Sequence, residues 1–378
     1  METNPLLSRR QVLRAGFAGA TLLGLAGCSA RQLNSSSAPL QLLSAVDDDQ
    51  GQHYITAVSQ SGEQAFMVPV SERCHGGCPQ PHGDHVVIFS RRPGREMHVI
   101  NTRSGKLERS IQAGEGFHYY GHGVYSPDAR YLYVTMNDYT TSEGLIRVYD
   151  AMNGYRALTD YPLDGIGPHE LRLHPDGVTL VVALGGIETH PDYDRLKLNT
   201  ASMQPALVLM DRQSGRITQR FEPSHHQLSC RHLDVSPEGI VIAGYQYEGP
   251  EWDTPPLIAK LDTRDMQFSE PELPLEEVMG LKNYTASIAI SPTSPFTVIT
   301  APRGGRAIII NHHTGELVQR VAVPDVAGAL PFGQHGFLVS SGTGGLFLLD
   351  AASDQPQPHG SYAVHWDNHL TPGRLRQA

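Results

Sequence analysis

Histidine side chains recur at matching positions ahead of a series of proline-containing turns. The turn prolines are Pro127, Pro175, Pro237 and Pro292. Five residues before them lie His122, Glu170, His232 and Ser287, and six residues before them lie Gly121, His169, Arg231 and Ala286. His75 takes the same place six residues before Pro81. Imidazole and carboxylate groups are ligands of first-row divalent metals. We therefore identify a candidate site for a divalent metal or iron in His75, His122, His169, Glu170 and His232.

Strand geometry limits how far this set can converge. Residues five and six before a proline point to opposite faces of a strand, so we expect only part of the set to meet at one point. A structural alternative is hydrogen bonding between repeats, with Asp234 or Arg172 as partners. A third possibility is the binding of an organic ligand or a protein.

Two cysteines flank one of these histidines, in the run Cys74-His75-Gly76-Gly77-Cys78. In an oxidising compartment Cys74 and Cys78 are candidates for a local disulfide, although the three-residue gap is tight. The alternative is metal ligation by Cys74, His75 and Cys78. The spacing is not Cys-x-x-Cys-His, so covalent haem attachment is not supported.

The elements that carry these residues form a repeat of about fifty residues. Each unit contains a strand ending in the X-Pro turn, a second strand, a third strand ending in Asp or Asn, and generally a fourth. Asn-Gly, Ser-Gly or Thr-Gly precedes the fourth strand in three of the four clear units, as expected for hairpins. Four strands in a unit of this length are typical of a propeller blade. Units beginning near Arg73 and Val326 are weaker copies.

The chain termini complete the count. Segments 40–46, 54–58 and 65–70 match strands two, three and four of a unit without a first strand, and 361–369 matches a first strand alone. The sequence therefore predicts an all-β, seven-bladed β-propeller over residues 40–370, closed by sharing one blade between the N- and C-terminal strands. Residues 371–378 are expected to form a tail. A six- or eight-bladed ring is the alternative.

The loops between second and third strands are long and rich in polar groups, whereas the turns on the opposite face are short. Because function concentrates on long loops carried by a rigid scaffold, we expect the site on the long-loop face. The candidate ligand-contacting residues there are Arg231, Asn137, Asp138, His190 and Tyr245.

The N-terminal segment indicates export. Arg9-Arg10 followed by an apolar stretch from Ala15 to Gly27 is typical of a twin-arginine signal peptide over residues 1–27. Leu25-Ala26-Gly27-Cys28 matches a lipobox, which predicts cleavage before Cys28 and its lipidation. The alternative is ordinary cleavage near Ser29-Ala30. Residues 28–39 are polar and predict a flexible tether. We expect a periplasmic protein anchored to a membrane.

Charge and motif content exclude several functions. The formal net charge is −10, and residues 1–27 carry three arginines and one glutamate, so the remaining chain has a net charge of −12. Such a surface repels phosphate backbones, so we expect no nucleic-acid binding. No nucleophile elbow, phosphate-binding loop or zincin helix is present in the sequence, which favours a binding module over an enzyme.

Several motifs resemble an uncharacterised bacterial family with a YVTN-like propeller that is usually exported by the twin-arginine pathway. They are 73–78 (Arg-Cys-His-Gly-Gly-Cys), 120–128, 137–139, 165–171, 185–192, 302–305 and 366–369 (Trp-Asp-Asn-His). The resemblance implies a periplasmic setting, often beside imelysin-type lipoproteins and a dihaem thiol-oxidoreductase-like protein in iron-responsive gene clusters. It brings no established activity.

Two functional hypotheses follow. The first is a binding or accessory module in iron or metal acquisition, acting through a His-rich channel mouth, with imelysin-type iron-uptake proteins as partners. The second is a metal-dependent propeller enzyme, either a lactonase-like hydrolase or an oxidoreductase component, in which the ion activates water.

Overall fold

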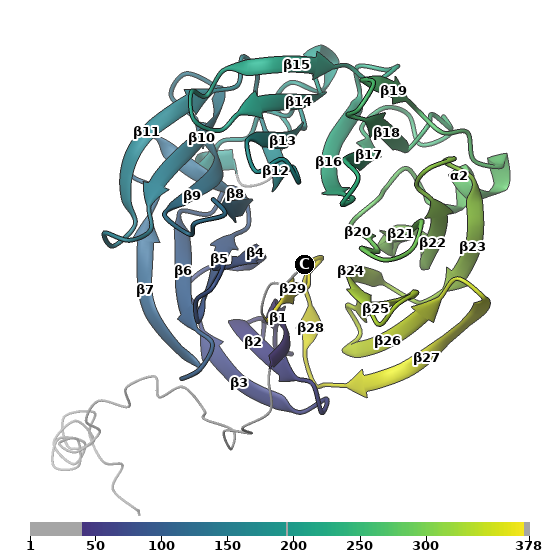
Figure 1. Cartoon of the computed structure of the whole chain (residues 1–378), viewed down its shortest axis with the longest axis horizontal. Helices are drawn as coiled ribbons and strands as arrows, with labels where there is room; N and C mark the ends of the chain where they lie inside the picture. The colour runs from purple at the N-terminus through teal and green to yellow at the C-terminus, as the bar shows by residue number, and fades with distance from the viewer. Residues whose placement is uncertain (1–39, 194–195, 374–378) are drawn as a thin grey trace, which may run out of the picture.

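Seven antiparallel sheets, six of four strands and one of five, surround a central axis in the computed structural model of the chain (Figure 1). The structure describes residues 40–193 and 196–373. The first strand of each sheet lies nearest the axis and the fourth lies at the rim, as in a β-propeller. The predicted fold class and the predicted number of blades are confirmed.

Six blades are continuous in sequence, and their strands follow the predicted order. The first comprises β4 (Cys74–Pro79), β5 (His85–Ser90), β6 (Glu96–Asn101) and β7 (Lys106–Gln112). The second comprises β8 (Phe117–Tyr125), β9 (Tyr131–Asp138), β10 (Glu143–Asp150) and β11 (Arg156–Pro162). The third comprises β12 (Pro168–Leu173), β13 (Thr179–Leu184), β14 (Ala206–Asp211) and β15 (Ile217–Phe221). The next three comprise β16 (Leu228–Val235), β17 (Ile240–Tyr247), β18 (Ile258–Asp262) and β19 (Gln267–Ser269); β20 (Ile288–Ile290), β21 (Phe296–Ala301), β22 (Arg306–Asn311) and β23 (Leu317–Ala322); and β24 (Val326–Phe332), β25 (Gly336–Ser341), β26 (Gly345–Asp350) and β27 (Ser353–Ser361).

The seventh blade joins the two ends of the chain. β1 (Leu40–Asp47), β2 (His53–Ser59) and β3 (Gln64–Pro69) supply three strands. β28 (His365–Trp366) and β29 (Thr371–Pro372) both pair with β1 and together form the innermost strand, so the shared blade is confirmed. In Figure 1 the yellow β28 lies beside the purple β1.

The boundaries of this closing strand differ from the prediction in two ways. Ser361 belongs to β27, the outer strand of the preceding blade, and not to the closing strand. Thr371 pairs with Leu43 and Pro372 with Leu42, so the paired strand runs past residue 370. Proline is tolerated there because β29 is the innermost strand and needs no further ladder partner.

Burial follows the position of each strand in its blade. The second strand β13 is buried over five consecutive residues because neighbouring blades cover both of its faces. The outer strands β7 and β11 are exposed at six of seven positions. The core lies between blades; one cluster, for example, joins Val87 and Phe89 to Leu132 and Val134 of the next blade.

Helical structure is scarce in the described part of the chain. It consists of α2 (Leu275–Gly280) and the 3₁₀ turns η1 (Pro191–Tyr193), η2 (Thr200–Ser202) and η3 (Pro302–Gly304). Within residues 40–193 and 196–373, no helix is long and apolar enough to cross a membrane.

Ring closure generates a stability prediction. A chain that stops after Tyr362 loses β28 and β29, and with them the buried Trp366 and Leu370. We expect the free energy of unfolding to fall by more than about 5 kcal/mol, because two large core side chains are removed and β1 becomes an open edge. Urea unfolding measures this change. A chain that stops after Gly373 is the control, and equal stability of the two truncated chains would contradict closure by the C-terminal strands.

Candidate metal centre

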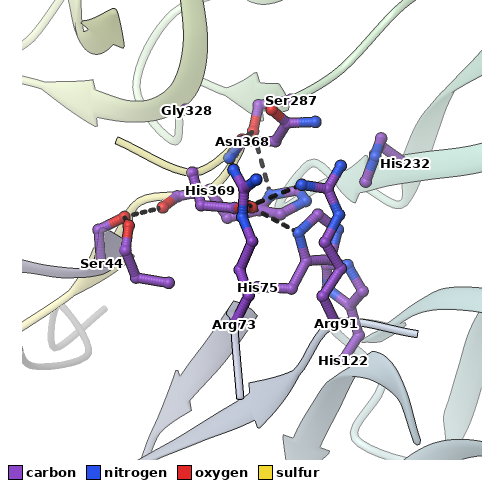
Figure 2. A network of polar contacts seen from close by, with 12 residues as sticks. Ser44, Arg73, His75, Arg91, His122, His232, Ser287, Gly328, Asn368 and His369 are labelled. Atoms are coloured by element: carbon purple, nitrogen blue, oxygen red, sulfur yellow. Dashed lines mark hydrogen bonds and ion pairs between the residues drawn. The ribbon is translucent and has the colours of Figure 1, made fainter. Parts of the chain in front are cut away.

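Five histidines meet on the propeller axis. His75, His122, His169 and His232 come from the first strands β4, β8, β12 and β16, and His369 comes from the segment between β28 and β29. Their measured ring-centroid separations range from 4.4 Å, for His75 and His369, to 5.9 Å, for His75 and His232. Each histidine is at most 7% exposed. Figure 2 shows four of them converging.

A β-bulge in each contributing strand brings these side chains together. The register shifts between Cys74 and Gly77, between Tyr119 and Gly123, between Pro168 and Glu170, and between Cys230 and His232. A bulge breaks the strict alternation of side chains and re-aims one of them. The expectation that residues five and six before a turn proline cannot both converge is therefore wrong in the blade of His169 and Glu170, since both approach His232.

Glycines allow the two nearest strands to approach closely. Gly121 has φ +104°, a conformation that other residues rarely adopt, and a Cβ there would lie 2.8 Å from Cδ2 of His75. A Cβ on Gly76 would lie 2.7 Å from Nδ1 of His122. These two glycines leave room for the rings of His75 and His122.

Hydrogen bonds orient three of the rings. Nδ1 of His75 donates to Asp367 Oδ1 at 2.6 Å, and Nδ1 of His232 donates to Glu170 Oε2 at 3.0 Å. Nδ1 of His369 lies 3.1 Å from Ser287 Oγ, whose own hydrogen is donated to the carbonyl of Asn368. Ser287 must therefore accept from His369, which fixes the tautomer with a lone pair on Nε2. Metal-ligating histidines are typically held in this way.

Other ring nitrogens in the cluster have no hydrogen-bond partner among the described residues. They are Nε2 of His122, Nδ1 of His169 and Nε2 of His369. A buried polar atom without a partner costs free energy and calls for an explanation such as a bound ion. The three atoms all belong to histidines of the central cluster.

The same environment keeps the rings neutral. Burial, followed by the positive charge that neighbouring histidines and arginines would present, holds the pKa of His122, His169, His232 and His369 well below the usual value. Neutral imidazole is the form that binds a metal. These four imidazoles are therefore neutral, and each has one ring nitrogen with a lone pair that can bind a metal.

The spacing suits a single ion. Three overlapping sets have ligand atoms within 4.8 Å of one another: His75, His122 and His369; His75, His169 and His232; and His122, Glu170 and His232. With metal–nitrogen bonds of about 2.1 Å, rings in adjacent positions have centroids roughly 4.5 Å apart and opposite rings roughly 6.4 Å apart. The observed separations run from 4.4 Å, close to the lower of these values, to 5.9 Å, between the two.

Asp367 connects the cluster to two arginines. Arg73 Nε lies 2.9 Å and Arg91 Nη1 lies 3.0 Å from its Oδ2. Burial alone would raise the pKa of this carboxyl, but Arg91, His75 and Arg73 outweigh burial and hold it well below the usual value. Asp367 therefore stays ionised and can anchor His75.

Cavities open toward both faces of the propeller from the histidine layer. A cavity of about 820 Å³ is lined by first-to-second-strand turns such as 79–84 and reaches Glu170, Ser287 and His369. A cavity of about 10 Å³ lies toward the long-loop face, because its lining includes residues at or just after the ends of second strands, such as Arg91 and Gln246. Its walls are His75, Arg91, Arg92, Tyr120, His169, Arg231, His232, Gln246, Tyr284 and Asn368. The histidines therefore lie inside the channel rather than at the predicted mouth.

The predicted ligand-contacting residues lie in different environments in the structure. Arg231 lines the small cavity. Asn137 and Asp138 end β9 rather than forming a loop; Asn137 is buried, and Asp138 accepts hydrogen bonds from the Thr140 backbone N–H and hydroxyl group. The ring of His190 packs against Tyr139 with centroids 4.9 Å apart. The prediction for Tyr245 is wrong, because it lies within β17 and packs in the hydrophobic core between blades.

The cysteine predictions are also corrected. Cys74 and Cys78 are free thiols on one strand, where four residues span about 13 Å, far beyond disulfide reach. They pack in different hydrophobic clusters, so they do not join His75 in a Cys–His–Cys metal site. Burial raises the pKa of both thiols. Cys28 and the proposed signal and tether, residues 1–39, lie outside the described residues.

Sequence reasoning missed His369 and Asp367. Both lie in the Trp-Asp-Asn-His run 366–369, which was noted only as a motif. No turn proline follows at the register used for the other blades, so counting back from prolines could not find them. The signal that could have found His369 is its place in the closing strand, which must reach the axis like every other first strand.

The chain belongs to the family described as protein of unknown function (DUF1513), which matches residues 68–372. No curated protein matches the chain. Among solved structures, Kuenenia stuttgartiensis hydrazine synthase is similar, with 15% sequence identity and a TM-score of 0.58. The likeness covers 88% of this chain and 99% of that chain, and at this identity it shows a shared fold alone.

A pH prediction follows from His118, a buried residue of β8 outside the five-histidine cluster. Burial lowers its pKa to about 4, so the folded protein holds it neutral while the unfolded chain protonates it near pH 6.5. The stability that the neutral His118 contributes to the folded protein is complete above pH 6.5. As the pH falls from 6.5 toward 4, the free energy of unfolding decreases by about 1.4 kcal/mol per pH unit because the unfolded chain binds the proton. Urea unfolding of chelator-treated protein between about pH 7.5 and about pH 5.5 measures this slope.

His118→Gln should reduce the slope below about pH 6.5, by an amount approaching the stated value, whereas substitution of the exposed His226 by Gln should leave it unchanged. A His118→Gln protein with the wild-type pH dependence would contradict the neutral, buried state of His118.

Proposed function

We propose that this member of the DUF1513 family binds one first-row transition-metal ion on the propeller axis and acts as a metal-binding accessory module. The observation that carries the proposal is the convergence of five buried histidines, three of which (His122, His169 and His369) have a ring nitrogen without a hydrogen-bond partner among the described residues. A purely structural cluster would be expected to satisfy these nitrogens within the protein.

The types of ligand atom in the site narrow the choice of metal. The site offers imidazole nitrogens and one nearby carboxylate, Glu170, and its neighbouring cysteines point elsewhere. Imidazole suits zinc, copper, iron and nickel, whereas magnesium and calcium prefer oxygen ligands. We propose iron as the physiological metal, supported by the sequence resemblance to proteins encoded in iron-responsive gene clusters.

The surrounding residues would hold the ion tightly. Asp367, Glu170 and Ser287 fix the rings of His75, His232 and His369, so little ordering is needed on binding. Burial also slows release and exchange with water. The arrangement suits retention or delivery to a partner, and we propose an imelysin-type iron-uptake protein as that partner.

Export remains part of the proposal. The Arg9-Arg10 pair and the lipobox ending at Cys28 support twin-arginine export and lipid anchoring in the periplasm. The twin-arginine route carries proteins already folded, which would permit metal loading before export. Processing of residues 1–27 and lipidation of Cys28 are tested by mass spectrometry of the mature N-terminus.

A metal-dependent hydrolase or an oxidoreductase component is the second candidate. The cavity of about 820 Å³ favours it, because that cavity has room for a small organic substrate and reaches Glu170 and His369. A bound ion there would supply Lewis-acid or redox chemistry. Lactone hydrolysis by metal-loaded protein that is lost in His122→Ala would support this candidate over a binding module.

Metal content tests the main proposal. Protein purified from periplasm should contain close to one equivalent of metal, measured by mass spectrometry of the elements. His122→Ala and His232→Ala each remove an imidazole from the centre, and we expect at least a tenfold loss of affinity for Fe²⁺, Zn²⁺ or Cu²⁺. His313→Ala, at an exposed position, is the matched control and should bind as wild type does.

Circular dichroism of the metal-free variants separates loss of a ligand from loss of fold. Unchanged affinity in both folded histidine variants, or wild-type protein without metal after aerobic and anaerobic loading, would overturn the proposed centre.

A further inference from the structure

We propose that the small cavity beside the histidines binds a planar oxyanion of the carboxylate type, either carbonate or the carboxylate group of a small acid, through Arg92 and Arg231. This inference rests on the proposed metal centre and names a second ligand for the same site.

Two guanidinium groups in this cavity are buried and incompletely paired. Arg92 is 6% exposed and Arg231 is 1% exposed. Nη1 of Arg92 and Nε of Arg231 have no hydrogen-bond partner among the described residues. Burying a charged donor without a partner is costly, so an acceptor that reaches both groups would relieve that cost.

The local charge is positive in a chain whose overall charge is negative. Arg231 pairs with Glu248 at 3.3 Å, but Glu248 is shared with Lys197. Arg91 and Arg73 both form ion pairs with Asp367, and Oδ2 of Asp47 lies 3.5 Å from Nε of Arg73. The cations of this region are thus Arg73, Arg91, Arg92, Lys197 and Arg231, and its anions are Asp47, Glu248 and Asp367. Two positive charges are left over although the chain as a whole carries −10. An anion would balance them.

The cavity joins these arginines to the candidate metal ligands. His75, His169 and His232, one of the three candidate ligand sets, line it together with Arg92 and Arg231. Tyr120, Gln246 and Asn368 add polar groups to the wall. An oxyanion held by the guanidinium groups would therefore lie beside a metal bound to this set and could complete its coordination. Guanidinium forks match planar carboxylates in geometry.

The size of the cavity limits the occupant. Its volume is about 10 Å³, so a large chelate or a phosphate ester would not fit. This space holds about one water molecule, so even carbonate or the end of a small carboxylic acid requires the wall side chains to move, although less than a larger anion does. Arg91, whose side chain is 14% exposed, lines the same cavity.

Metal and anion should bind cooperatively. A divalent ion adds positive charge to a region that already has an excess of positive charge, and an oxyanion offsets that charge. By linkage, each ligand then raises the affinity for the other by the same factor, and couplings of about 5- to 150-fold are typical.

Titration of the full-length protein with Co²⁺ as the metal probe tests the inference. The titration is run in carbonate-free buffer, and then with bicarbonate, acetate or chloride added. We expect bicarbonate to tighten Co²⁺ binding about tenfold and to change the visible absorption of bound Co²⁺. Arg92→Gln and Arg231→Gln should lose this response. Arg156→Gln, at an exposed position on the outer strand β11, is the control. Arg92→Lys serves if the glutamine variants do not fold, and it should give a reduced response because it keeps the charge without the fork.

Each outcome decides between possibilities. A response to bicarbonate alone identifies carbonate, and an equal response to acetate identifies a carboxylate group. Equal effects of chloride, or Co²⁺ binding that no anion changes, would overturn the anion site while leaving the metal centre intact. Absence of Co²⁺ binding in every buffer would instead overturn the metal centre. In that case, bicarbonate must raise the melting temperature of metal-free wild type but not of Arg92→Gln, or the anion site fails as well.

Discussion

The burial of uncharged imidazoles at one height of the propeller axis is the constraint on which the rest of the structure depends. Seven first strands converge on that axis, so side chains at equivalent positions are forced into contact. Four histidines of the cluster have a pKa held well below the usual value by burial and by the positive charge that neighbouring histidines and arginines would present to a protonated ring. The remaining nitrogens must find partners, and Asp367, Glu170 and Ser287 satisfy only some of them.

The segment that closes the propeller ring also completes the histidine cluster. His369 and Asp367 lie in the segment that pairs with β1, whereas His75, which Asp367 contacts, lies 292 residues earlier in the sequence. The first strand of the closing blade is interrupted between Trp366 and Thr371, and that interruption directs both side chains to the axis. The device that removes the open edge of the propeller thus also supplies a candidate ligand and the carboxylate that orients another. A binding site built this way exists only in the closed, folded chain.

Sequence reasoning was strongest where periodicity determines structure. Repeated X-Pro turns and alternating apolar residues predicted the number of blades and most of their inner strands, and the common register of His75, His122, His169 and His232 indicated their convergence. It failed where local backbone geometry breaks the period. The bulges at Pro168–Glu170 and Cys230–His232 cannot be read from residue types, and they decide which neighbours face the axis. Tyr245 was misplaced because β17 runs further than its apolar core suggests, and Cys74 and Cys78 because an extended strand separates them.

Anomalous diffraction from crystals of metal-loaded protein, recorded on both sides of the absorption edge of the bound metal, tests the central claim most directly. The account predicts one strong peak on the propeller axis, about 2.0–2.3 Å from nitrogens of at least three of the five histidines. A peak at the protein surface, or an axis without a peak in protein shown to carry metal, would contradict it.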